Sequence, residues 1–339
     1  MIRFRLTYLI LAALLGTLLI ASCDEPEKEE FDHPLKFNIS YLSNAQVASY
    51  SDQYVDFKLS ITNLQAYYDV DYIEEYVDLD TSNFKFPAGE NYSYEITDAE
   101  YIPPGQPQPY SLCILMDLSD GYSEFDKNNH RYEAFNGFMQ KFNPMSEFVF
   151  AGYSRGGRLE NEPVDIIGDG FANRWSEQLA IDVLDMALNT GGTSPILEAV
   201  DEMIGWIDEN ASTSNRHILV FAHRDDNSVD VHIDTIIAKA IEKNVKIDLM
   251  WYNAENLYSY PWAMAKMAHK TGGMNIYVDH FFRFNTAFLA LDRMYRGDFG
   301  HFRVTARRIA PPGTFYEGYY FGNFGLSTGF YYWVFWIDL

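Results

Sequence analysis

The segment Asp117-Leu118-Ser119-Asp120-Gly121 brings a carboxylate and a hydroxyl close together in the chain. It directly follows the apolar run at residues 111–116 (SLCILM), which has the length of one buried strand. In open α/β sheets, ligands bind at the carboxyl ends of the strands. Asp117 and Ser119 therefore stand where a ligand would bind if the chain forms such a sheet.

The residues after position 108 have the pattern of that sheet. Short apolar runs typical of strands buried on both faces occupy residues 111–116, 148–151, 218–222, 245–251 and 275–278. Apolar residues recur at helical spacing in residues 135–142, 196–207 and 233–241. Ser194 as N-cap and Pro195 as first helical residue predict the start of the second helix. The alternation of strands and helices predicts a doubly wound, mostly parallel α/β domain over residues 109–298.

Three segments of this region resemble the von Willebrand factor A (VWA) domain family. Asp117 and Ser119 resemble the start of its metal-ion-dependent adhesion site, an Asp-x-Ser-x-Ser loop that acts with a distant Thr and a second Asp. Residues 190–197 (TGGTSPIL) are similar to its Gly-Gly-Thr segment, and residues 264–273 (MAKMAHKTGG) to its closing helix. The resemblance implies that Asp117, Ser119 and Thr193 hold Mg²⁺ or another divalent cation.

Two positions depart from the family pattern. Gly121 replaces the second hydroxyl of the loop, and His223 follows the fourth core strand, where the second Asp is usual. Fewer oxygen ligands weaken a Mg²⁺ site, whereas an imidazole suits Mn²⁺ or Zn²⁺ better. In the alternative without a cation, Asp117 bridges backbone amides. In both cases we expect Asp120, Gly121, His223 and Asp225 to face a protein partner.

A second motif favours a different chemistry. Gly152-Tyr153-Ser154-Arg155-Gly156 has the Gly-x-Ser-x-Gly form of a hydrolase nucleophile elbow, in which Ser154 would be the nucleophile of a surface serine hydrolase. That elbow must lead into a helix, but residues 158–163 show no helical apolar period and end in proline. We therefore expect a binding protein rather than an enzyme, with no catalytic residue.

The first 34 residues have the pattern of an exported lipoprotein. Two arginines precede an apolar run that ends at Ile20-Ala21-Ser22-Cys23, and this end resembles the lipobox of bacterial lipoproteins. The resemblance implies a signal peptide at residues 1–22 and a lipid anchor on Cys23. Residues 23–34 form an acidic tether. Acid after such a cysteine resembles signals for the surface of the bacterial outer membrane, where we expect the protein.

The rest of the chain, residues 35–108 and 299–339, favours β-structure. Every second residue is apolar in residues 55–61 (VDFKLSI), which is the period of a half-buried strand. The aromatic tail at residues 299–339 is too short to fold alone. We expect these two parts to form one β-sandwich, into which the α/β domain is inserted.

Composition excludes one class of partner. The formal net charge is −23 for 339 residues, and it becomes −25 when the signal peptide and its two arginines are removed. Nucleic acid is therefore a poor partner, because binding it requires Lys and Arg. With Cys23 lipidated, Cys113 has no cysteine to pair with. The sequence predicts an adhesion or surface-complex protein with an unidentified protein ligand, and a purely structural surface protein is the remaining alternative.

Overall fold

The structure is a computed structural model, and it describes most of the chain from residue 39 to residue 337. The described ranges are 39–51, 53–66, 73–74, 84–85, 90–120, 130–140, 142–156, 163–188, 190–229, 231–252, 262–278, 283–297, 301–313, 318–326 and 329–337. The predicted signal peptide, the lipidation site Cys23, the acidic tether and Gly121 lie outside these residues.

Six strands form the central sheet of the α/β domain. They are β6 (Ser111–Asp117), β7 (Glu147–Tyr153), β8 (Val164–Ala172), β9 (Arg216–Ala222), β10 (Val245–Tyr252) and β11 (Asn275–Val278). Their order is β11-β10-β9-β6-β7-β8, and every pairing is parallel except that of β7 with β8. This is the doubly wound order, in which the chain leaves the first strand on one side and later returns to its other side. The predicted fold class is confirmed.

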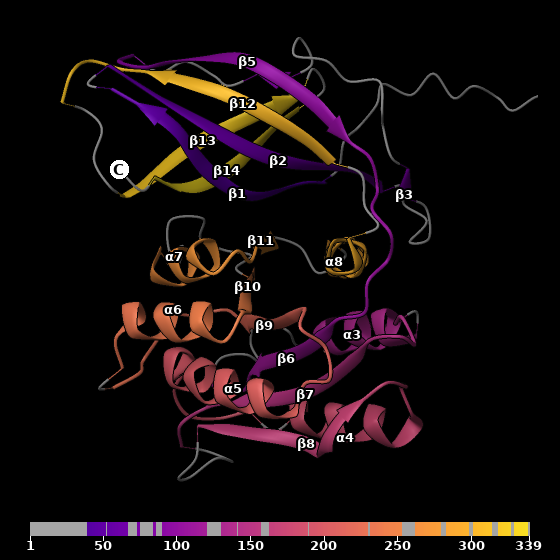
Figure 1. The fold of residues 1–339 in the computed structure, drawn as a ribbon. Coiled ribbons are helices and arrows are strands. Elements are labelled where there is room, and N and C mark those ends of the chain that lie inside the picture. The colour runs from indigo at the N-terminus through magenta and orange to yellow at the C-terminus, as the bar shows by residue number, and fades with distance from the viewer. Residues whose placement is uncertain are drawn as a thin grey trace, which may run out of the picture. The chain divides into compact units, whose positions relative to one another are not determined.

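Helices cover both faces of this sheet (Figure 1). They are α3 (His130–Gln140), α4 (Glu177–Leu188), α5 (Ile196–Asn210), α6 (Ile233–Glu242), α7 (Trp262–Lys270) and α8 (Arg283–Arg296). In β6, Ile114 and Met116 pack into the core under α3, α4 and α8, whereas Cys113 and Leu115 pack into the core under α5, α6 and α7. Alternate side chains of a strand point to opposite faces, so an all-apolar strand fills both cores.

The remaining strands form two antiparallel sheets. One has the order β1 (Ile39–Tyr50), β2 (Tyr54–Ala66), β12 (His301–Ile309), β5 (Ser93–Ile102), with β3 (Ile73–Glu74) paired to β2. The other has the order β14 (Gly329–Ile337), β13 (Gly318–Leu326), β4 (Phe84–Lys85), and β14 contacts β1. Because β12 lies between β2 and β5, the chain leaves this part after β5 and returns to it after the α/β domain.

The chain segments that enter and leave the α/β domain are hydrogen-bonded to each other. The Gly105 amide donates to the Gly297 carbonyl at 2.9 Å, and the Gln108 amide donates to the Arg296 carbonyl at 2.8 Å. Inside the domain, the Tyr110 hydroxyl donates to Asp292 on α8 at 2.6 Å. The start of β6 and the end of α8 are therefore held together where the domain is inserted.

An ion pair joins the neighbouring strands β2 and β12, which the α/β domain separates in the sequence. Arg307 lies directly opposite Asp56 and donates two hydrogen bonds to its carboxylate, at 2.7 and 3.0 Å. The guanidinium also lies over the Tyr54 ring, 4.4 Å from its centroid. These hydrogen bonds lower the pKa of the Asp56 carboxyl, against the opposing effect of burial. The pair therefore stabilises the fold when Asp56 is ionised.

We predict a pH-dependent effect for Asp56→Asn. A folded pKa below the unfolded value stabilises the fold above the ordinary Asp pKa, and this contribution disappears as the pH falls through the folded pKa. The variant should cost about 1 kcal/mol of unfolding free energy near pH 7 and clearly less near pH 3, measured by urea denaturation. Glu100→Gln is the control, because its pair with Arg303 is 3.4 Å long and exposed. An equal Asp56→Asn deficit at both pH values would contradict the assignment.

Candidate functional site

Asp117 lies where the strand order of the sheet reverses. It is the last residue of β6, whose neighbours are β7 on one side and β9 on the other. Its side chain is fully buried. One carboxylate oxygen, Oδ1, accepts the Ser119 amide at 2.8 Å, and the other, Oδ2, accepts the Ser194 hydroxyl at 3.0 Å. The structure thus places a buried, hydrogen-bonded acid at the position where doubly wound sheets bind ligands.

The hydroxyl beside Asp117 belongs to Ser194 and not to Thr193, on which the sequence resemblance falls. Thr193 has an exposed side chain, and its backbone forms an antiparallel bridge with Arg155. Neighbouring side chains of extended backbone point in opposite directions, so Ser194 faces the carboxylate. This position also corrects the expected N-cap, because α5 begins at Ile196 and the Ser194 hydroxyl is bound to Asp117.

His223 is the third side chain at Asp117. It directly follows β9, and its own side chain is 1% exposed. Its Nδ1 lies 3.0 Å from Asp117 Oδ2, so the imidazole stands within ion-pair distance of the carboxylate. The residue that departs from the family pattern is therefore brought to the predicted site.

Ser119 is buried beside the same carboxylate. Its amide is bound to Asp117, but within the described part of the chain its hydroxyl has no hydrogen-bond partner. A buried hydroxyl without a partner costs free energy. Among the described residues, the Ser119 hydroxyl is thus a buried polar group of this site that no protein group satisfies.

Backbone hydrogen bonds hold the surrounding loops together. The Gly191 amide donates to the Leu118 carbonyl at 2.7 Å, and the Asp120 amide donates to the Gly192 carbonyl at 2.9 Å. Gly192 has φ +82°, and a Cβ added to it would lie 2.1 Å from the Arg155 carbonyl oxygen. Only glycine fits this position without a backbone shift. We call residues 117–120, 153–156, 190–194 and 223–229 the loop face.

A buried arginine side chain on α3 binds the backbone of the loop face. Arg131 on α3 is 2% exposed. Its guanidinium donates to the Asp117 carbonyl at 3.0 Å and to the Ala187 carbonyl near the end of α4 at 2.6 Å. Arg131 was not predicted from the sequence, because an arginine in an amphipathic helix is usually exposed. Its contacts fix the backbone of Asp117 independently of the side chain.

The other predicted partner-binding residues differ in exposure. Asp120 and Asp225 are exposed on the loop face, whereas His223 is buried. Nearby, Arg155 forms an ion pair with Glu198 in the first turn of α5. The carboxylates of Asp120 and Asp225 therefore lie on the outer surface of the loop face, whereas Asp117 and His223 lie in its interior.

The donors present fit one divalent cation with few strong ligands. Asp117 supplies a carboxylate, Ser194 a hydroxyl that contacts it, and Ser119 a second buried hydroxyl, and such oxygens are the hard donors that Mg²⁺ and Mn²⁺ prefer. Among the described residues, no group of three or more His, Cys, Asp or Glu side chains is placed to hold a metal. A cation would therefore depend on a single carboxylate, with the His223 imidazole beside it.

The structure does not form a nucleophile elbow at Ser154. The Ser154 side chain is buried, and its hydroxyl is 3.5 Å from the Gly156 carbonyl. Arg155 and Gly156 form β-bridges instead of starting a helix, and β8 starts at Val164. An elbow exposes its serine at a sharp strand-to-helix turn. In the described residues, Ser154 is therefore buried and is not exposed at such a turn.

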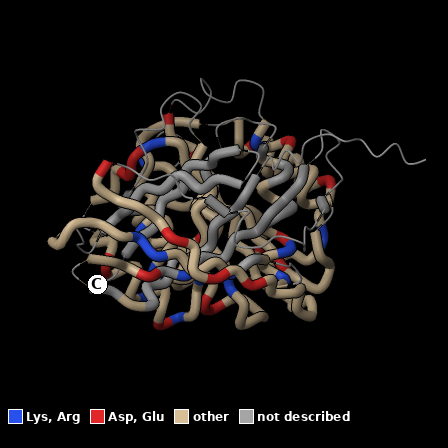
Figure 2. Tube along the Cα trace, turned by 90° about the horizontal axis from the view of Figure 1, so that it is seen from above, with Lys and Arg blue, Asp and Glu red and all other residues tan. Residues whose placement is uncertain are grey.

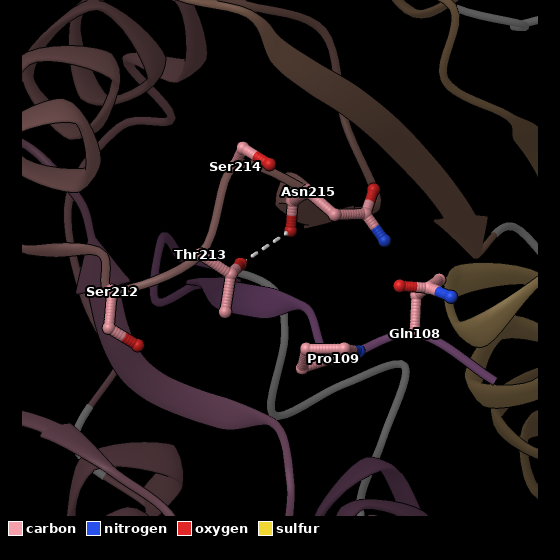
Figure 3. Close-up of a pocket in the computed structure, with 6 residues that line it drawn as sticks. All are labelled: Gln108, Pro109, Ser212, Thr213, Ser214 and Asn215. Atoms are coloured by element: carbon pink, nitrogen blue, oxygen red, sulfur yellow. Dashed lines mark hydrogen bonds between the residues drawn. The ribbon is translucent and has the colours of Figure 1, made fainter.

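A cavity of about 400 Å³ lies at the opposite ends of the same strands (Figure 3). Its lining residues are neutral: Gln108, Pro109, Ser212, Thr213, Ser214 and Asn215. Beside it, His217 is buried between Asp248, 2.9 Å from Nδ1, and Asn215, 3.1 Å from Nε2. Burial lowers the pKa of His217, and Asp248 opposes this effect. Since Asn215 also donates to the Tyr295 carbonyl, this group holds α8 in place.

The acidic residues are spread over the described chain and do not gather in one patch of the backbone trace. Figure 2 shows acidic residues along the described chain, interspersed with Lys and Arg. Several are paired between neighbouring helices, such as Asp201 with Lys239 and Asp234 with Lys266. No helix of the described residues is both long and apolar enough to span a membrane.

Comparisons with known proteins concern the fold. No protein-family model matches the chain, and no curated protein matches it. A von Willebrand factor type A structure from Catenulispora acidiphila is 9% identical, with a TM-score of 0.46 over 88% of this chain and 72% of that chain. The pilus adhesin SpaC from Lactobacillus rhamnosus GG, in an open conformation, is 8% identical, with a TM-score of 0.43 over 89% of this chain and 54% of the adhesin.

A third similar structure is proximal thread matrix protein 1 from the mussel byssus. It is 10% identical, with a TM-score of 0.40 over 61% of this chain and 50% of that chain. The present chain thus spans about half the length of the mussel protein and of the adhesin.

We predict that Gly192→Ala destabilises the protein by about 2 kcal/mol or more. The new methyl group would meet the Arg155 carbonyl, and the positive φ would be strained. Gly205→Ala is the matched control, because Gly205 lies inside α5 and an added Cβ meets nothing within 4 Å. The control should be stabilised by about 0.5–1 kcal/mol in urea denaturation. Similar changes in both variants would show that Gly192 is not sterically required.

Proposed function

We infer that this chain is a protein-binding component of a bacterial cell surface, and that it binds through the loop face of a VWA-like domain. Its role is adhesion or the assembly of a surface complex, by binding without catalysis. The observation that carries this proposal is the buried Ser119 hydroxyl, which has no partner among the described residues, on a residue whose amide binds the buried Asp117 carboxylate. Together they form an incomplete polar site at the strand ends where doubly wound sheets take ligands.

The loop face is suited to binding a macromolecule because its parts are held rigidly. The Arg155–Thr193 bridge and the amides of Gly191 and Asp120 connect loops that are far apart in the sequence. Pre-organised loops lose little conformational entropy when a partner binds. The exposed carboxylates of Asp120 and Asp225 favour a partner with basic groups at the rim of the contact.

A divalent cation is the ligand that the interior of the loop face fits. Asp117, Ser119 and Ser194 would hold it. When bound, the cation would supply a positive charge that attracts a carboxylate or another oxygen donor of the partner. One carboxylate among the protein ligands gives a weaker site than several would. His223, beside the same carboxylate, favours Mn²⁺ over Mg²⁺.

The location that we propose is the outer face of the outer membrane, through lipid on Cys23. The lipobox-like segment and the acidic tether support this location. Several acyl chains on one residue give stable anchoring, which a single chain does not. The tether would hold the α/β domain away from the membrane, so that a partner can reach the loop face.

We predict that Ser119→Ala weakens Mn²⁺ binding by about tenfold or more and changes the unfolding free energy by less than about 1 kcal/mol. The hydroxyl is proposed to be a cation ligand, and it has no hydrogen bond to lose in the described structure. Calorimetric titration of the chelator-treated mature chain with Mn²⁺, Mg²⁺ and Ca²⁺ measures the affinity.

Ser154→Ala is the matched control for this experiment. It also removes one buried hydroxyl from the loop face, but Ser154 belongs to neither the proposed cation site nor its contacts. The affinity of Ser154→Ala for Mn²⁺ should equal that of the unmodified chain. Equal weakening in both variants, or no heat from any of the three ions with the unmodified chain, would contradict the cation site.

We predict that Cys23→Ser abolishes lipid labelling. Metabolic labelling with a palmitate analogue should mark the unmodified protein, and the variant should lose both the label and its membrane association. Cys113→Ala is the control, because Cys113 is buried in the core and should not affect labelling. A Cys23→Ser protein that stays labelled in the membrane fraction would contradict the anchor.

A further inference from the structure

We propose that residues 226–229 are a positioning segment that fixes Ser194 and His223 against Asp117, with Asp226 as its central residue. This inference rests on the proposed function of the loop face and names how that site is held together.

The segment supplies the N-terminal cap that α5 lacks. The residue before the helix is Pro195, which has no side-chain cap. Instead, Asp226 Oδ1 accepts the Leu197 amide at 3.1 Å, and the Ser228 hydroxyl oxygen accepts the Glu198 amide at 3.1 Å. The first amides of a helix have no intrahelical acceptor, so these two side chains complete the first turn of α5 from a separate loop.

Amides of the segment also donate to acceptors at the start of α5. The Glu198 carboxylate accepts the Val229 amide at 2.7 Å, and the Ser194 carbonyl accepts the Asn227 amide at 2.8 Å. The Ser228 hydroxyl donates to Asp226 at 2.6 Å, which orders the segment internally. The loop after β9 and the start of α5 are thus joined reciprocally.

This connection determines the geometry at Asp117. Ser194 lies directly before α5, and His223 lies three residues before Asp226 on the same loop. Both approach the same oxygen, Asp117 Oδ2, at 3.0 Å. If the segment were released, the two groups could move independently. The segment therefore controls whether the imidazole and the hydroxyl remain together on one carboxylate oxygen.

The test compares Asp226→Ala with Asp226→Asn in the mature chain labelled with ¹⁵N-histidine. Asp226→Ala removes the acceptor for Leu197, whereas Asp226→Asn keeps an oxygen there. Glu242→Ala removes an exposed acid of α6 and controls for charge. The readouts are the imidazole ¹⁵N signal of His223, assigned with a His223→Gln variant, and amide hydrogen exchange of residues 194–198.

In Asp226→Ala, we expect the His223 signal to shift and exchange at residues 194–198 to accelerate about fivefold or more. The signal of His217, at the other end of the sheet, should not move, and Asp226→Asn should restore both readouts. Faster exchange with an unmoved His223 signal would overturn the inference, because the segment would then cap the helix without positioning the site. So would a failure of Asp226→Asn to rescue. Neither readout needs a cation, so the outcome is separate from that of the Mn²⁺ titration.

Discussion

The burial of one carboxylate is the constraint on which the loop face depends. Asp117 ends a strand that fills two apolar cores, and its side chain has no access to water. An ionised carboxylate in such surroundings costs several kcal/mol unless it is hydrogen-bonded or paired. The Ser119 amide, the Ser194 hydroxyl and the His223 imidazole approach it from three segments. Three segments of the loop face thus meet at one buried acid.

Two other features of the site depend on the close approach of these segments to each other. The approach of residues 190–194 to residues 153–156 leaves no room for a side chain at Gly192. The start of α5 faces the carboxylate with Ser194, so its amides are capped by Asp226 and Ser228 from another loop. A rigid sheet that carries tightly connected loops is a common arrangement for recognition. It is the arrangement on which the proposed binding role rests.

Most of the fold could be predicted from the sequence because its signals are local. Continuous apolar runs identified the parallel strands, and helical spacing identified α3, α5 and α6. The edge strand β8 was not predicted. Its half-exposed residues and two glycines with positive φ, Gly168 and Gly170, give no clear apolar run. The pairing of β12 with β2 and β5 was expected only because residues 299–339 are too short to fold alone, and the register of this pairing could not be derived from the sequence.

The candidate site was predicted less completely. Asp117 and His223 could be placed because each follows a recognisable strand. Thr193 and Ser194 are adjacent hydroxyl residues, and only the tertiary bridge to Arg155 decides which of them faces inward. The roles of Arg131 and Asp226 depend on contacts distant in sequence. The run Asp226-Asn227-Ser228 was the one available signal, since such residues favour caps and turns.

The most direct test of the central claim is a crystal of the mature chain soaked in Mn²⁺, with anomalous diffraction recorded above the manganese absorption edge. We predict one anomalous peak within coordination distance of oxygens of Asp117 and Ser119, absent from a crystal of the Ser119→Ala variant. A map without a peak there, or with manganese only at exposed carboxylates, would contradict the claim that this buried acid belongs to a ligand site.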